Sequence, residues 1–107
     1  MFATVAELLE HPQRWTKRAY ARSHAGYTEL PRSEDAACWC LVGACRCVYG
    51  EGTDACTAAI RALSNAVQKR QGKPIRSYLL IDQVVYFNDD PKTLHSDVLE
   101  VAREAGV

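Results

Sequence analysis

The sequence has no excess of charge of either sign and no long apolar run. Thirteen basic and thirteen acidic residues cancel over 107 residues, so the chain lacks the net positive field on which counterion-release binding to nucleic acid depends. No segment approaches the roughly 18 consecutive apolar residues that a membrane helix needs. We therefore expect neither nucleic acid nor a membrane to be the partner of this protein.

Targeting signals, repeats and an even cysteine count are also lacking. The start, MFATVAELLEHPQRW, has no basic run followed by an apolar stretch and a small-residue cleavage site. There is no internal repeat, low-complexity tract or linker. Five cysteines without a secretory signal indicate free thiols in a reducing compartment rather than a disulfide framework. We expect a cytoplasmic protein that forms a single globular domain over residues 1–107.

Helix start and stop signals divide most of the chain. Thr4 and Glu7 form a predicted capping box, Ser33 precedes two acidic residues at a helix start, and Thr53 or Asp54 begins the next helix. Glycines and prolines mark the ends of the predicted helices. The predicted helix over residues 34–49 is apolar on all sides, so it must be buried on all sides. These signals predict helices over residues 5–11, 34–49, 54–70 and 94–105.

Two segments are ambiguous in the sequence. Residues 14–23 alternate loosely, which indicates an edge strand or an irregular extended arm. Residues 75–90 fit a helix followed by a short strand, or one longer strand, and the run Val84 to Phe87 favours strand locally. A ribbon could pair the Trp15 region with the Val84 region. The predicted fold is mainly α, with about four helices around a central buried Cys-rich helix, and it allows a short two-stranded β ribbon (α+β).

Four of the five cysteines lie in the stretch AACWCLVGACRCVY, residues 36–49. Zinc needs about four ligands converging at about 2.3 Å, usually from paired turns. On one helix, cysteines seven residues apart share a face but lie about 10.5 Å from each other along the axis. A metal would need His11, His24 or His95 to close on two of them. We therefore predict no metal and no cofactor, and thiols that pack as small buried hydrophobes. The four residues are Cys38, Cys40, Cys45 and Cys47.

A catalytic alternative uses the same stretch. Cys38 or Cys40 at a helix N-terminus would be a nucleophile, His95 its base, and Asp89, Asp90 or Asn88 the orienting group. A cysteine followed by Trp, with a histidine and an acid downstream, superficially resembles papain-like and related cell-wall peptidases. The detail differs, because no glycine-rich elbow precedes the cysteine and the histidine lies in a predicted helical turn.

The polar cluster FNDDPKTLHSD, residues 87–97, has a structural explanation and a functional one. Asn and Asp before Pro form a turn, and Thr93 can cap the following helix. The same residues are dense in hydrogen-bond acceptors, and loops often carry binding residues. Their spacing is not that of an EF-hand. Trp15 and Trp39 are interpreted first as core or lid residues.

These motifs together resemble a family of small domains of unknown function that we associate with actinobacteria and their phages. The resemblance lies in residues 15–20, in AACWCLVGA with its Cys-x-x-Gly-Ala core, and in Phe-Asn-Asp-x-Pro-x-Thr before the last helix. The family pattern has Trp where Phe87 stands here. The resemblance implies no activity, but it directs attention to Trp15, Cys40, Gly43, Asn88 and Asp89.

Two classes of function follow. The first is a small binding or interaction protein, a phage or bacterial accessory factor acting through protein contacts, with Trp15, Asn88 and Asp89 as binding residues. The second is a compact cysteine-dependent hydrolase or transferase that uses Cys38 or Cys40 with His95 and Asp89. A protein partner is expected, and a homodimer stays an open alternative.

Overall fold

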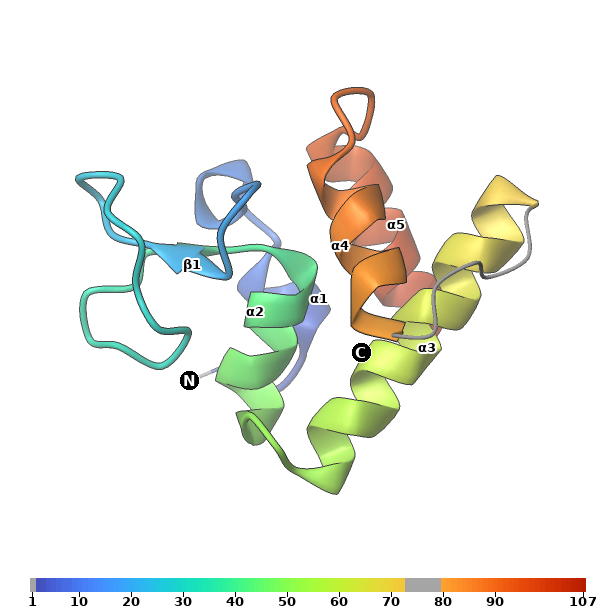
Figure 1. Ribbon diagram of the computed structural model, residues 1–107, viewed down its shortest axis with the longest axis horizontal. Coiled ribbons are helices and arrows are strands. Elements are labelled where there is room, and N and C mark those ends of the chain that lie inside the picture. The colour runs from blue at the N-terminus through green and yellow to red at the C-terminus, as the bar shows by residue number, and fades with distance from the viewer. Residues whose placement is uncertain (1, 73–79) are drawn as a thin grey trace.

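Helices make up most of the fold (Figure 1). The computed structural model describes residues 2–72 and 80–107. The predicted class, mainly α with a short ribbon, is confirmed. In chain order the described elements are α1 (Val5–Leu8), the 3-10 turn η1 (Pro12–Arg14), β1 (Ala21–Arg22), β2 (Cys38–Trp39), α2 (Leu41–Cys45), the π-type turn η2 (Arg46–Gly50), α3 (Asp54–Gln71), α4 (Leu80–Asp89) and α5 (His95–Ala105).

The helices form two groups that share one core. α4 and α5 pack against α3, while α1 and the ribbon lie on the other side of α2, which also contacts α4 (Figure 1). The amide of Ala6 donates to the carbonyl of Val107 at 3.1 Å, so the two ends of the chain meet. Apolar side chains from both groups fill the core, among them Val5, Leu41, Leu63, Val84 and Val98, all fully buried.

The helices with complete end signals form as predicted. Thr53 Oγ1 accepts the amide of Cys56 at the start of α3, and Gly72 ends that helix with a left-handed φ of 66°. α5 begins after Leu94, whose amide donates to Asp97 Oδ2 at 2.8 Å. α1 is shorter than predicted and ends at Leu8. No helix within residues 2–72 and 80–107 is both long and apolar enough to cross a membrane.

The prediction of one helix over residues 34–49 is wrong. Cys38–Trp39 is a strand that pairs antiparallel with Ala21–Arg22, and the helix begins only at Leu41. Local capping by Ser33 does form, because its Oγ accepts the amide of Asp35 at 3.2 Å. The helix does not continue beyond this turn, because two of the following amides bond to the N-terminal arm: Ala37 N donates to Arg22 O and Cys40 N to Tyr20 O.

The preference for a strand at residues 84–87 is also wrong. Residues 80–89 form α4, and the part of the prediction over residues 75–79 lies outside the described residues. Two of the residues that favour a strand locally, Val84 and Phe87, face the core from a helix, because they lie three apart and both are buried. The ribbon therefore joins β1 to β2, not the Trp15 region to the Val84 region.

Gly43 permits a close crossing of two backbone segments. A Cβ added at Gly43 would overlap the carbonyl oxygen of Tyr20 and lie within 3.0 Å of two more backbone atoms of that residue. The N-terminal arm thus passes directly over the first turn of α2. A glycine inside a buried helix is tolerated where another backbone must pass close by, and the contact with Tyr20 supplies that reason for Gly43.

We predict that Gly43→Ala lowers the free energy of unfolding by about 3 kcal/mol, because neither backbone can yield easily. Gly52→Ala is the control, since its added methyl meets open space and only the left-handed φ of 79° is strained, a cost of about 1 kcal/mol. Urea denaturation followed by circular dichroism measures both. Equal losses in the two variants would contradict the close crossing.

Candidate functional site

The side chain of Asn88, near the end of α4, joins three parts of the chain. Asn88 is fully buried. Its Oδ1 accepts from Trp15 Nε1 at 2.8 Å and from the amide of Leu41 at 3.1 Å. Its Nδ2 donates to Thr16 O at 3.1 Å and to Asp89 Oδ1 at 3.0 Å. Since an amide side chain offers two donors and two acceptor lone pairs, every hydrogen bond that Asn88 can make is made within the protein.

The arm over residues 15–18 is fixed to the end of α4 by further contacts. Lys17 Nζ donates to Asp90 O at 2.6 Å and to Thr93 O at 3.0 Å. The amide of Arg18 donates to Asp89 Oδ1 at 2.9 Å. Arg18 has a φ of 65°, the only positive value among the described residues other than glycine, a conformation that costs roughly 1 kcal/mol. The bond to Asp89 therefore holds a strained turn in place.

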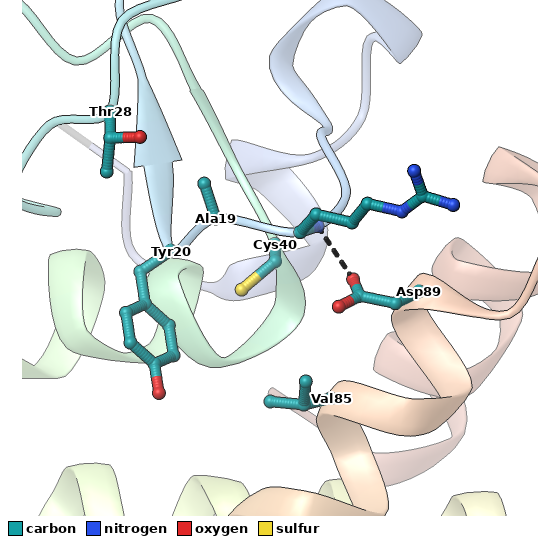
Figure 2. Close-up of a pocket in the computed structure, with 7 residues that line it drawn as sticks. Ala19, Tyr20, Thr28, Cys40, Val85 and Asp89 are labelled. Carbon is teal, nitrogen blue, oxygen red and sulfur yellow. Dashed lines mark hydrogen bonds between the residues drawn. The ribbon is translucent and has the colours of Figure 1, made fainter.

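A cleft of about 370 Å³ opens beside this crossing (Figure 2). The extended arm forms one wall, α4 the opposite wall, and the first turn of α2 the floor between them. The volume is in the lower part of the range of protein sites for small ligands or single side chains. The lining residues are Arg18, Ala19, Tyr20, Thr28, Cys40, Val85 and Asp89.

Asp89 presents one carboxylate oxygen to this cleft. Its Oδ1 already accepts two hydrogen bonds, from Arg18 N and from Asn88 Nδ2. Within residues 2–72 and 80–107, Oδ2 has no hydrogen-bond partner, and Figure 2 shows the second oxygen directed toward the open space. The two bonds on Oδ1 fix the orientation of Oδ2, so the carboxylate is positioned before any ligand arrives.

Tyr20 forms the far side of the cleft. It is 41% exposed, and the guanidinium of Arg46 lies over its ring, 4.4 Å from the centroid. Arg46 begins the π-type turn and also pairs with Glu51 at 3.1 Å. The ring is thus held by a cation on one face, an arrangement that limits its motion.

Cys40 lies at the floor and acts as the N-cap of α2. Its Sγ accepts the amide of Gly43 at 3.3 Å. Burial raises the pKa of the Cys40 thiol from its ordinary value of 9.0 to about 11, although the hydrogen bond from Gly43 opposes that rise. The thiol is therefore almost entirely protonated at pH 7. Because the thiolate is the nucleophile, this environment favours a packing and capping role.

The other residues of the catalytic alternative lie in separate contacts. His95 Nε2 is 2.6 Å from Leu9 O, and the His95 ring packs 6.0 Å from the Trp15 ring, centroid to centroid. Cys38 donates weakly to Arg22 O at 3.7 Å. A catalytic role for Cys38 or Cys40 together with His95 and Asp89 stays a prediction. In the described part of the chain, no group of three or more His, Cys, Asp or Glu residues could hold a metal ion.

The sequence reasoning named Asp89 and Cys40 but missed the other residues of the cleft. Hydrogen bonds of Asn88 bring together the three predicted binding residues, Trp15, Asn88 and Asp89, and their role in binding stays a prediction. Val85 lies one helical turn before Asp89, so a helical interpretation of residues 80–89 would have placed both on one face. The remaining cleft residues come from an irregular arm and its loop, and no local signal gives them a role in a site, although the resemblance covers residues 15–20. These residues are Arg18, Ala19, Tyr20 and Thr28.

A comparison with protein-family models matches residues 1–106 to a family of unknown function, DUF6197. The chain belongs to this family. Searches of curated proteins and of solved structures gave no match. The expected resemblance to a family of small domains of unknown function is confirmed, while the actinobacterial or phage origin stays a prediction.

We predict that Asn88→Ala lowers the free energy of unfolding by about 3 kcal/mol, because Trp15 Nε1, Leu41 N and Thr16 O lose their buried partner. Asn65→Ala is the matched control on the exposed surface of α3, and we expect it to change stability by less than about 0.5 kcal/mol. Chemical denaturation monitored by Trp fluorescence measures both. A loss at Asn88 no larger than that at Asn65 would contradict the role of Asn88 in joining these segments.

We predict that Cys40 alkylates more slowly than the half-buried Cys38 and Cys47 at neutral pH. Its rate should rise with pH toward its pKa of about 11, because only the thiolate reacts. Timed iodoacetamide labelling with peptide mass spectrometry follows each thiol, and urea-unfolded protein supplies the control in which all thiols are accessible. Preferential labelling of Cys40 at neutral pH would instead support the cysteine nucleophile.

Proposed function

We propose that this protein is a binding module that engages a protein partner through the cleft between the arm and α4. The observation that carries the proposal is the positioned but unsatisfied Oδ2 of Asp89, which faces a cleft with one apolar wall. Asn88 and Trp15 support the site by fixing the arm and the end of α4. Their role in binding is therefore positional, and Asp89 is the residue that contacts the partner.

The setting of the cleft agrees with recognition of a protein segment. Tyr20 and Tyr86 are exposed by 41% and 70%, and aromatic residues of this kind are enriched at protein interfaces. Tyr86 follows Val85 on α4 and points in a direction about 100° away, so it lies outside the cleft lining. More specifically, we propose that the protein is a cytoplasmic accessory factor of a bacterium or a phage.

The cysteine-dependent hydrolase or transferase is the second candidate. One observation favours it, because Cys40 lines the same cleft in which Asp89 presents its carboxylate. The raised pKa of Cys40 opposes it, as does the contact of His95 with Leu9 rather than with a cysteine. The thiol-labelling experiment distinguishes the two candidates.

We predict that peptides selected from a random displayed library against the intact protein bind at this cleft. Val85→Arg fills the cleft from α4 and should weaken their binding at least about tenfold, since a buried contact area and its shape are lost. Ala58→Arg introduces the same side chain at an exposed position of α3 outside the cleft lining, and it should leave affinity unchanged. Circular dichroism confirms that both variants fold.

Peptides that bind Val85→Arg as tightly as the unaltered protein would contradict the proposal. So would a selection that enriches no peptide sensitive to this substitution. Size-exclusion chromatography with light scattering shows whether a homodimer already covers the cleft, in which case Val85→Arg would yield monomers.

A further inference from the structure

The free acceptor in the cleft is a single oxygen. Asp89 Oδ1 accepts from Arg18 N at 2.9 Å and from Asn88 Nδ2 at 3.0 Å, which occupies both of its lone pairs. Oδ2 is therefore the only carboxylate oxygen of this residue that can take a new donor. A ligand must approach it as a monodentate partner.

Because only Oδ2 is free, Asp89 distinguishes between the guanidinium of arginine and the ammonium of lysine. A guanidinium binds carboxylate best through two parallel N–H bonds to both oxygens, and that geometry needs a free Oδ1. A primary ammonium is a compact point charge whose donors can each be used singly. The arrangement at Asp89 consequently favours ammonium over guanidinium.

The walls of the cleft suit the stem of a lysine side chain. Val85, Ala19 and the ring of Tyr20 are apolar surfaces that line the approach to Oδ2 (Figure 2). A lysine places its four methylene groups along such a surface while its charged end reaches a polar partner. Cys40 Sγ, which points into the same space, adds a soft apolar floor.

From this arrangement we infer that the cleft binds a lysine side chain of the protein partner, with the ammonium on Asp89 Oδ2 and the methylene stem between Val85 and Tyr20. This inference rests on the proposed function, since it names the residue through which the partner is recognised. The charge of Asp89 and the apolar residues that line the cleft identify this occupant.

Arg18 sets a second condition on binding. Arg18 lines the cleft together with Asp89, and its guanidinium makes no hydrogen bond or ion pair with the described residues. A cation at the rim repels an incoming ammonium. Arg18→Ala should therefore strengthen lysine binding severalfold, whereas an acidic ligand would be weakened by the same substitution.

The test titrates ¹⁵N-labelled protein with three capped amino acids, the acetyl methylamides of lysine, arginine and norleucine, and follows the amides of Arg18 and Cys40. We expect lysine to bind about tenfold more tightly than norleucine and about fivefold more tightly than arginine. Asp89→Asn keeps an Oδ1 acceptor for Arg18 N but removes the charge. It should therefore abolish the preference for lysine, while the chemical shift of the Arg18 amide in the ligand-free protein stays unchanged.

Other outcomes separate this inference from the proposed function. Equal binding of arginine and lysine would overturn the monodentate site. Norleucine methylamide with a free α-amine binding as well as capped lysine would overturn the side-chain assignment. If peptides from the displayed library bind at the cleft but tolerate replacement of each lysine by norleucine, the inference fails while the proposed function stands. If no peptide depends on the cleft, the proposed function itself fails.

Discussion

The cleft depends on one buried amide side chain, that of Asn88. Three of its four hydrogen bonds connect the end of α4 to the arm through Trp15 and Thr16, and to the first turn of α2 through Leu41. Each partner is a polar group that burial would otherwise leave unsatisfied, at a cost of about 1 to 3 kcal/mol. An apolar residue of similar size would fill the space but could not hold three segments in register. Hydrogen bonding therefore sets the geometry of the cleft walls, and the apolar core stabilises the arm, α2 and α4 in that arrangement.

A backbone contact completes this arrangement on the opposite side of the arm. Gly43 lets the carbonyl of Tyr20 approach the first turn of α2, and Cys40 N donates to that same carbonyl at 3.3 Å. The amides at the start of α2 are then shared between Asn88 Oδ1 and Cys40 Sγ. A thiol is a weak acceptor, yet it packs well in a site that is 4% exposed. This explains why a cysteine can serve here both as a cap and as part of the core.

The sequence predicts the elements whose signals are local and misses those that depend on distant partners. α3 and α5 have caps, glycine ends and a regular apolar period within their own residues, and both form nearly as predicted. Residues 34–40 carry helix signals too, but their amides find acceptors in the arm, about 15 to 20 residues earlier in the chain. Similarly, the packing of α4 against α3 outweighs the β propensity of Val84 and Val85. For the site, Asp89 and Cys40 stand out by residue type, whereas Tyr20 and Arg18 become part of it only because the arm is folded onto both helices.

The adjacent residues Asn88 and Asp89 have different roles. Asn88 joins the segments of the fold, whereas Asp89 is the residue proposed to contact a partner. Successive helix positions differ by about 100° in direction, so Asn88 points into the crossing while Asp89 reaches the cleft. The order cannot be reversed, because a carboxylate at position 88 would have no donor for Thr16 O. An amide at position 89 would keep the bond to Arg18 N but would leave the cleft without a charge. The bond from Asn88 Nδ2 to Asp89 Oδ1 further links the two roles, since it helps to leave Oδ2 as the free oxygen. The same hydrogen-bond network that stabilises the crossing thereby determines which atom is presented to a partner.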